Sequence, residues 1–331
     1  MKQYVHLIGK VLIRLCLLAM AGWAVVAIIY SNLPHILSVC IACMFGGGSL
    51  LLLTTRLYRD RRALPIFLVA FAVVLVWWLN IPPSNSRNWQ PDVAVLPWAD
   101  IHGNRVTIHN IRNCDYRSET DYTVHYYDKS FDLDTLNSLD LAIVYWGSPY
   151  IAHTMLSFGF EGGGIVCFSI ETRKEIGEEY STVKGFFRQY ELTYVVADER
   201  DLIGLRTNYR GEQVYLYRLN PPNALARKVF LDYLQAVNSL KDRPEWYNAL
   251  TSNCTTNIRG HAVPYSQDVR LSWRMLINGF LDELLYERKM VNTSMPFPDL
   301  KKISLINERA KGMDKSPDFS QMIRLGLPVR K

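Results

Sequence analysis

The stretch Ile151-Ala-His-Thr-Met-Leu-Ser-Phe-Gly-Phe-Glu-Gly-Gly-Gly-Ile-Val-Cys-Phe-Ser-Ile-Glu-Thr172 contains two apolar segments joined by a glycine-rich link. Ile151–Phe158 and Ile165–Thr172 have the length of strands and are rich in β-branched and aromatic residues. The glycines of Gly159–Gly164 allow the backbone conformations that a tight turn needs. The stretch therefore predicts a β-hairpin.

Further strands flank this hairpin, and helices follow them. The other segments with strand-like composition are Val106–Arg112, Leu141–Trp146, Tyr194–Ala197 and Val214–Arg218. Helical spacing of apolar residues begins near Asn223 and continues to Leu240, and two more helices are predicted near Asn253 and over Leu276–Tyr286. Strands followed by helices are typical of an α+β domain, which we place at residues 93–331.

The first 81 residues have a different character. Three long apolar segments, Val11–Tyr30, Leu33–Leu53 and Leu64–Ile81, follow one another with short links. A single such segment could be a buried core helix or a signal peptide. Three in succession favour a membrane anchor of three transmembrane helices, because each is close to the length that crosses a hydrocarbon core of ~30 Å. Residues 82–92 then form a short polar linker.

The basic residues of this region predict its orientation. Lys and Arg occur before or near the start of the first apolar segment, at Lys2, Lys10 and Arg14, and between the second and third, at Arg56, Arg59, Arg61 and Arg62. The link Ser31–His35 has neither. Because Lys and Arg remain on the cytoplasmic side, we expect a cytoplasmic N-terminus and an extracytoplasmic α+β domain. A chain with three transmembrane helices resides in a lipid bilayer, so we expect the bilayer to be its partner. We expect this bilayer to be the bacterial inner (cytoplasmic) membrane.

Charge and cysteine content exclude several classes of function. The net charge is +6, with 37 Lys and Arg scattered among 31 acidic residues, so a nucleic-acid binder is not expected. Cys40 and Cys43 are separated by two residues, but both lie in an apolar segment and are expected to behave as small hydrophobic residues, so we expect neither a metal nor a cofactor. Whether Cys114 and Cys167 form a disulfide stays open at this stage.

The segment Tyr247-Asn-Ala-Leu-Thr-Ser-Asn-Cys-Thr-Thr-Asn-Ile-Arg259 carries the clearest chemical signal. Asn253 is a favoured N-cap residue, so Cys254 is predicted to occupy the first helical position. The unpaired N–H groups and positive dipole end of a helix favour a thiolate there, and the same N–H groups can bind an oxyanion. We therefore expect Cys254 to be a nucleophile supported by Asn253 and Thr255. A buried cysteine below a helix cap is the alternative.

A cysteine nucleophile needs a base, and His153 is the candidate because it interrupts an apolar strand. A hydrogen-bonded core histidine is the alternative. In a tight hairpin, one register sets His153 opposite Glu171, which could then fix the tautomer of the imidazole. The register that differs by one residue sets Ile170 there and turns Glu171 to the other face. The sequence leaves both registers open.

Three further residues are candidates for substrate binding. Arg173 and Lys174 follow the second strand of the hairpin, where they could hold a phosphate or carboxylate, although a solvated pair of charges explains them as well. Trp146 ends the preceding strand.

Several of these motifs resemble one protein family. The motifs that carry the resemblance are Trp146-Gly-Ser-Pro149, His153-Thr-Met-Leu-Ser-Phe158, Ile170-Glu-Thr-Arg-Lys-Glu175, Tyr247-Asn-Ala-Leu-Thr-Ser-Asn-Cys-Thr-Thr-Asn-Ile258, Arg117-Ser-Glu-Thr-Asp121 and Phe186-Phe-Arg-Gln-Tyr190. Over about residues 90 to 330, the chain resembles the Lnb-type periplasmic domain family. That family includes bacterial lipoprotein intramolecular transacylases, which move an ester-linked acyl chain to the N-terminal cysteine of a lipoprotein.

The order of histidine before cysteine is also similar to circularly permuted NlpC-type members of the papain-like group. The resemblance implies a papain-like α+β fold with an antiparallel sheet packed against helices. It also implies Cys254 as nucleophile and His153 as base, acting on a lipoprotein or another acyl-lipid substrate. A cysteine peptidase or amidase of cell-wall peptide and a non-enzymatic envelope scaffold are the alternatives.

Overall fold

The computed structural model describes residues 2–54, 62–266 and 269–328. The chain divides into two compact units, and each is considered by itself. The anchor unit contains Met1–Ser84 and the loop Tyr180–Glu191. The second unit contains Asn85–Glu179 and Leu192–Lys331, which include every residue of the candidate site.

The anchor unit has three apolar helices, α1 (Lys2–Ile29), α2 (His35–Thr54) and α3 (Ala63–Leu79). Among the described residues, two segments are long and apolar enough to cross a membrane, Tyr4–Ile29 and His35–Leu53. The third is shorter than predicted, with 17 residues. Asn80 caps the C-terminal end of this helix, and the two prolines that follow Ile81 cannot continue it. The helix therefore ends two residues before the apolar segment does. The prediction of three full-length spans is therefore corrected to two.

The loop Tyr180–Glu191 belongs to the anchor unit because its aromatic and basic side chains contact the helix ends. The ring of Phe187 lies 6.2 Å from that of Trp23 and 6.5 Å from that of Trp78, measured between centroids. Arg188 donates hydrogen bonds of 2.7 and 2.8 Å to the carbonyls of Leu79 and Ile81. The motif Phe186–Tyr190, one of those that carry the family resemblance, therefore holds this loop against the helices of the anchor unit.

The second unit is built on one large mixed sheet with the strand order β1-β2-β9-β8-β7-β6-β10, and β5 also pairs with β2. Its strands are β1 (Trp98–His102), β2 (Arg105–Arg112), β5 (Tyr126–Asp132), β6 (Leu136–Tyr145), β7 (Ala152–Phe160), β8 (Gly164–Arg173), β9 (Glu191–Ala197) and β10 (Gln213–Arg218). A small separate sheet pairs β3 (Asp115–Tyr116) with β4 (Tyr122–Thr123).

The α+β class is confirmed, but the sheet is not purely antiparallel. Strands β2 and β9 pair in parallel through Arg112 and Ala197. A parallel pair needs a long connection, and here strands β3 to β8 lie between the two partners in the chain. Short-range sequence patterns do not reveal such a pairing.

The predicted hairpin is formed by β7 and β8. Its register pairs Phe160 with Gly164 and Met155 with Ser169. Gly164 adopts a positive φ of 78°, a conformation that favours glycine. Continued by two residues along each strand, this register sets His153 opposite Glu171, the first of the two alternatives.

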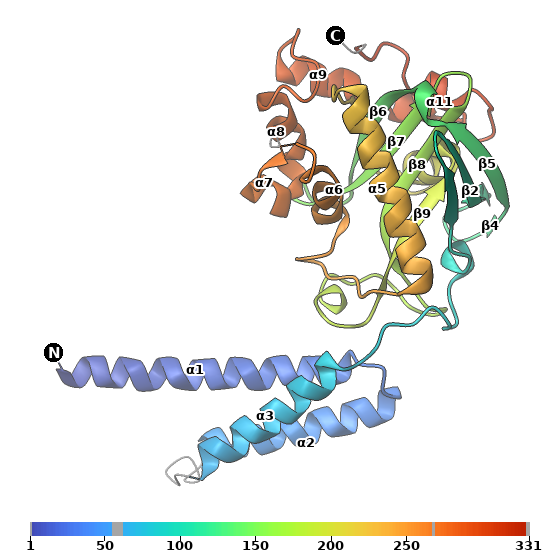
Figure 1. Cartoon of the computed structure of the whole chain (residues 1–331). Coiled ribbons are helices and arrows are strands. Elements are labelled where there is room, and N and C mark those ends of the chain that lie inside the picture. The colour runs from blue at the N-terminus through green and yellow to red at the C-terminus, as the bar shows by residue number, and fades with distance from the viewer. Residues whose placement is uncertain (1, 55–61, 267–268, 329–331) are drawn as a thin grey trace. The chain divides into compact units, whose positions relative to one another are not determined.

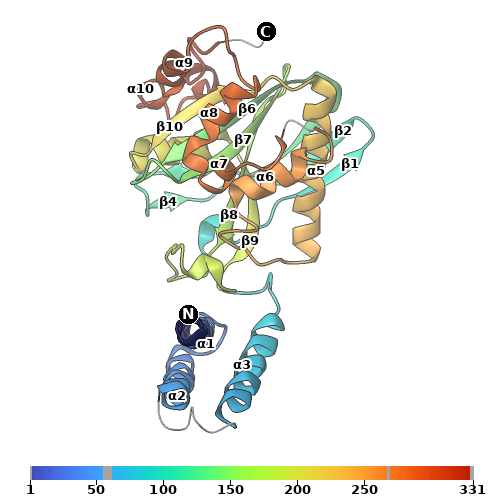
Figure 2. The same ribbon diagram turned by 90° about the vertical axis from the view of Figure 1, so that its left-hand side faces the viewer.

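Helices cover both faces of the sheet (Figures 1 and 2). On one face, Phe158 and Phe168 pack against Phe230 and Tyr233 of α5 (Asn223–Asp242). The same side holds α6 (Cys254–Ala262), α7 (Trp273–Leu276) and α8 (Leu281–Glu287). The aromatic contacts give α5 a fixed position against the hairpin.

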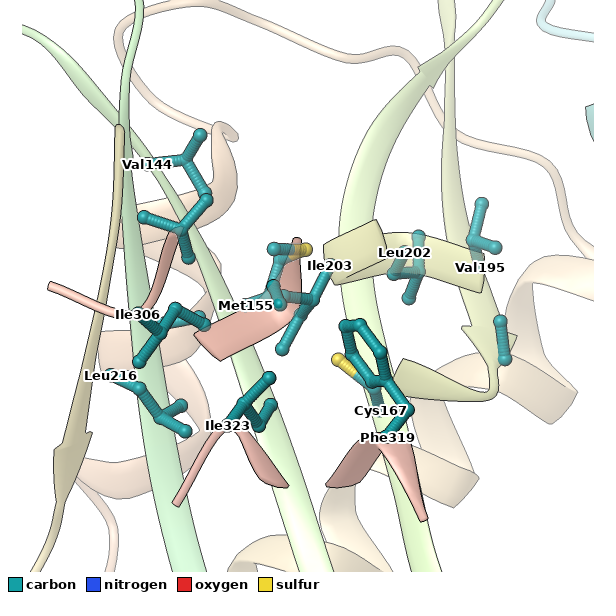
Figure 3. Close-up of a cluster of buried hydrophobic side chains, with 14 of the residues drawn as sticks. Val144, Met155, Cys167, Val195, Leu202, Ile203, Leu216, Ile306, Phe319 and Ile323 are labelled. Carbon is teal, nitrogen blue, oxygen red and sulfur yellow. The ribbon is translucent and has the colours of Figure 1, made fainter. Parts of the chain in front are cut away.

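The opposite face is closed by α4 (Glu199–Gly204) and by the C-terminal helices α10 (Asn307–Ala310) and α11 (Phe319–Met322). Figure 3 shows Phe319 beside Cys167 of the hairpin and Ile306 near Leu216, and these residues belong with Ile323 and Met155 to one buried cluster. Helix α9 (Phe297–Ser304) precedes them. The C-terminal region, for which the sequence suggests no role, thus completes the hydrophobic core.

Candidate active site

Cys254 occupies the first position of α6, as the local sequence predicts. The side chain of Asn253 accepts a hydrogen bond of 3.0 Å from the backbone N–H of Thr256. The Thr256 hydroxyl in turn accepts one of 2.9 Å from the backbone N–H of Asn253. This reciprocal capping box holds the first helical turn. It fixes the position of Cys254 without using the thiol.

Two backbone N–H groups at this helix start are available to a ligand. Within the described part of the chain, the N–H groups of Cys254 and Thr255 have no hydrogen-bond partner. They stand at the positive end of the α6 dipole. A negatively charged oxygen close to the Cys254 sulfur would be stabilised there.

The start of α6 is tied to β7 by Asn278, which sequence reasoning missed. Its side-chain amide accepts a hydrogen bond of 2.7 Å from the N–H of Ala152 and donates one of 2.5 Å to the carbonyl of that residue. The same amide donates to the Thr255 hydroxyl at 2.7 Å. The next residue, Gly279, lies so close to the Pro149 carbonyl that a Cβ would clash with it. The strand that carries His153 is therefore held against the helix that carries Cys254.

His153, Ser169 and Glu171 form a hydrogen-bonded group at the end of the hairpin. The Nε2 atom of His153 lies 2.7 Å from the Ser169 hydroxyl and 3.1 Å from the Glu171 carboxylate. The Ser169 hydroxyl donates a hydrogen bond of 2.6 Å to Glu171. Because Nε2 is engaged in this way, Nδ1 is the ring nitrogen left to interact with Cys254, whose side chain is coupled electrostatically to His153. Cysteine, histidine and glutamate thus form one connected group.

The carboxylate has a second partner that the sequence did not suggest. Arg206, in the π-helical turn Leu205–Tyr209, donates a hydrogen bond of 3.1 Å to Glu171. It also pairs with Glu212 at 3.2 Å. Arg206 lies 35 residues after Glu171 in the chain. Only the fold brings the two together, so no local pattern could identify it.

These contacts oppose the effect of burial on the titratable groups. Burial disfavours a charged His153, but the Glu171 carboxylate and the Cys254 side chain outweigh it and raise the pKa of His153 to about 9. Burial alone would raise the pKa of Cys254, yet His153 and hydrogen bonds from Thr154 lower it to about 7. His153 and Arg206 hold the pKa of the buried Glu171 well below its usual range. The arrangement therefore favours a thiolate beside an imidazolium.

The other cysteines have the opposite environment. Cys114 and Cys167 are fully buried free thiols. Burial raises the pKa of Cys114 to about 12 and the pKa of Cys167 well above its usual value. They are not disulfide-bonded to each other.

The three residues considered for substrate binding do not join this group. Arg173 is buried, its guanidinium stacks 4.3 Å from the Trp89 ring, and it donates to the carbonyls of Val93 and Ala94. Since those donors are occupied, Arg173 has a structural role and the expectation of substrate binding is corrected. Lys174 is half-buried, and its carbonyl accepts from Gln90.

Trp146 is exposed and lines a polar hollow of about 760 Å³. Glu212, the second partner of Arg206, also lines that hollow, whereas Cys254 and His153 do not. Trp146 therefore stands at a neighbouring cavity. No group of three His, Cys, Asp or Glu residues among the described residues is arranged to hold a metal ion.

Alkylation by iodoacetamide should reveal the thiolate. At pH 7 a thiol with a pKa of about 7 is half ionised, whereas an ordinary thiol with a pKa of ~8.5 is only ~3% ionised. We expect Cys254 to react at least roughly tenfold faster than either Cys114 or Cys167. Its rate should rise as the pH passes through about 7. Peptide mass spectrometry at a series of pH values measures both.

The variant Glu171→Gln provides the matched comparison. It keeps the size of the side chain but removes the charge that favours the imidazolium, so the midpoint for Cys254 should move to higher pH. Equal labelling of all three cysteines, or an unchanged midpoint in Glu171→Gln, would contradict this reading of the site.

Comparison with models of protein families matches residues 122–279 to the family described as the Lnb N-terminal periplasmic domain. The matched segment is shorter than the region over which the sequence resembles that family, but it contains His153, Glu171 and Cys254. No curated protein and no solved structure gives a significant match to the chain.

Proposed function

Since residues 122–279 are an Lnb-type periplasmic domain, we propose that the protein is a membrane-anchored, extracytoplasmic thiol acyltransferase with Cys254 as nucleophile and His153 as base. The family is linked to lipoprotein-processing enzymes in general. The observation that carries the proposal is the placement of Cys254, at the start of α6, against the strand of His153, whose Nε2 atom lies 3.1 Å from Glu171. Nucleophile, base and orienting carboxylate are the parts that acyl transfer through a thioester requires.

In the first step, His153 holds the proton of the thiol and the Cys254 thiolate attacks the carbonyl carbon of an acyl ester. The backbone N–H groups of Cys254 and Thr255 stabilise the oxyanion of the tetrahedral intermediate. As this intermediate collapses, the C–O bond of the ester breaks and the imidazolium of His153 protonates the leaving alkoxide. The products are an acyl-thioester on Cys254 and a free alcohol.

In the second step, an amine attacks the thioester. Neutral His153 takes the proton of the amine, the C–S bond breaks, and the acyl chain leaves as an amide while the thiolate is restored. Water in place of the amine would give a hydrolase. A lipoprotein or another acyl-lipid is the substrate that a membrane anchor suits best, because enzyme and acyl chain then share one surface.

The proposed location is the bacterial inner membrane, with the α+β unit on its outer side, where a periplasmic domain belongs. The basic residues in the first half of α1, Lys2, Lys10 and Arg14, and those between α2 and α3 favour a cytoplasmic position for the N-terminus and for that link. Although α3 is shorter than the two segments of full spanning length, we propose that its 17 residues also cross the membrane and carry the chain outward. That length is at the lower end of the range of about 17 to 25 residues that span a bilayer. In intact spheroplasts, a charged and membrane-impermeant thiol reagent should modify Cys254; protection until lysis would contradict this orientation.

The proposed reaction predicts a change in lipoprotein N-termini. In a bacterial strain that lacks other enzymes for N-acylation of lipoproteins, expression of this protein should convert the free α-amine of the N-terminal cysteine into an acyl amide. Mass spectrometry of the N-terminal lipopeptide detects the conversion as movement of one acyl group. Cells that express Cys254→Ala supply the control.

Unchanged lipopeptides would argue against the transfer reaction. If purified protein instead released peptides from peptidoglycan, the cysteine peptidase or amidase of cell-wall peptide would replace it. Absence of both activities, with a Cys254 thiol of ordinary reactivity, would leave the envelope scaffold.

A further inference from the structure

A second cavity lies directly behind the start of α6. It has a volume of about 200 Å³, is partly open to solvent, and is lined by residues of the sheet and of helices α5, α6 and α8. Its walls are mainly aliphatic, and representative lining residues are Leu141, Leu156, Val229, Ile258, Leu284 and Leu285. The charged residues of the lining are all cations, so a positively charged occupant is disfavoured.

Thr255 connects this cavity with the candidate nucleophile. Thr255 is one of the residues that line the cavity, and its hydroxyl oxygen lies 3.9 Å from the Cys254 sulfur. The Asn278 amide fixes that hydroxyl at 2.7 Å. A carbonyl carbon bonded to the sulfur would therefore have its substituent close to the mouth of an apolar cavity.

An empty apolar cavity destabilises a fold, because its lining atoms lose packing contacts. Cavities of this kind stay dry and bind apolar molecules instead of water; a cavity of ~150 Å³ accepts benzene, with six carbons. By proportion, about 200 Å³ accepts an apolar segment of about eight carbons. This exceeds the four side-chain carbons of leucine.

We propose that the cavity lined by α5, α6, α8 and the sheet binds the first part of an acyl chain, about eight carbons, while the carbonyl carbon of that chain is bonded to Cys254. This inference rests on the proposed thiol acyltransferase function and adds to it the location and the length of the acyl subsite. Val229 and Leu284 line this subsite from two different helices, α5 and α8.

The test uses the full chain in nanodiscs and 4-nitrophenyl esters of acetic, butanoic, octanoic and hexadecanoic acid. The Cys254 thiolate forms a C–S bond with the acyl carbon, the C–O bond breaks, and 4-nitrophenolate leaves with the bonding electrons. Absorbance follows the nitrophenolate, and intact-mass spectrometry follows the acyl-enzyme. We expect the rate of acylation to increase on the order of a hundredfold as the acyl chain lengthens from two carbons (acetate) to eight (octanoate). The hexadecanoate ester should acylate Cys254 at a rate similar to that of octanoate.

Variants of the lining sharpen the test. Val229→Phe and Leu284→Phe should each lower the ratio of octanoyl to acetyl rates by on the order of tenfold, because they fill the cavity from two different helices. Leu225→Ala, which enlarges it, should favour longer chains. Val237→Phe is the matched control, because it adds the same volume as Val229→Phe to α5 at a buried position outside the lining. Its ratio of octanoyl to acetyl rates should therefore equal that of the wild type.

Three outcomes would overturn the inference. A rate that stops increasing at four carbons would indicate a pocket for a peptide side chain. If Val229→Phe and Leu284→Phe both leave the ratio of octanoyl to acetyl rates unchanged, the acyl chain binds elsewhere. Acylation of Cys254 in that case would still support the proposed function. Failure of every ester, including acetate, to acylate Cys254 would remove the proposed function and this inference with it.

Discussion

Replacement of Cys254 by alanine is expected to abolish acyl transfer, with a loss of at least roughly 10⁴-fold. Without the sulfur no thioester forms, and neither the helix dipole nor the backbone N–H groups can replace a nucleophile. Cys254→Ser should be nearly as inactive, because a hydroxyl stays protonated at a pH where the thiol, with a pKa of about 7, is half ionised. The acyl-enzyme measured by intact mass and the product measured by lipopeptide mass both report the loss.

The fold should survive these changes. The first turn of α6 is held by Asn253 and Thr256, neither of which depends on the sulfur. Cys167→Ala and Cys114→Ala are matched controls, since each removes a buried thiol whose pKa is raised instead of lowered. Both should retain activity. Transfer by Cys254→Ala at the wild-type rate, or an equal loss in Cys167→Ala, would remove Cys254 from the mechanism.

The general architecture could be predicted from the sequence because its signals are local. The hairpin over residues 151–172 has two apolar segments and a turn that only glycine accommodates, and the start of α6 has a capping residue in the right place. Long-range features could not be predicted. The parallel pairing of β2 with β9 and the closure of the core by α10 and α11 depend on residues far apart in the chain.

The same distinction separates the predicted site residues from the missed ones. Cys254 and His153 stand out because a polar, reactive residue occurs within a regular local pattern. Asn278 and Arg206 act only across the fold, one between α6 and β7 and the other on the Glu171 carboxylate. Arg173 is the opposite case, a residue that the sequence suggested for substrate binding but that has a structural role. The sequence shows only two adjacent charges at Arg173 and Lys174 and gives no sign that Arg173 is buried against Trp89.

Replacement of His153 by alanine should reduce acyl transfer by on the order of 10³-fold. The imidazolium is the main influence that lowers the pKa of Cys254 against the effect of burial. Without it the thiol is protonated at neutral pH, and no base accepts its proton. The wild-type rate should form a bell between about pH 7 and about pH 9, the values at which the thiol and the imidazolium lose their protons. In His153→Ala the rate should instead rise continuously with pH, as the raised pKa of the thiol is approached.

Removal of a buried imidazole also removes packing contacts, which could lower activity by itself. The control for His153→Ala must therefore remove another buried imidazole. His261 is as buried as His153 and lies on α6, but its ring nitrogens contact Tyr194 and Asp232 at 2.7 Å each. His261→Ala should keep the bell-shaped profile even if it lowers stability. In His153→Ala the Glu171 carboxylate retains Arg206 at 3.1 Å and Ser169 at 2.6 Å, so no buried charge is left alone. A bell that persists in His153→Ala, or disappears in His261→Ala, would assign the base to another residue.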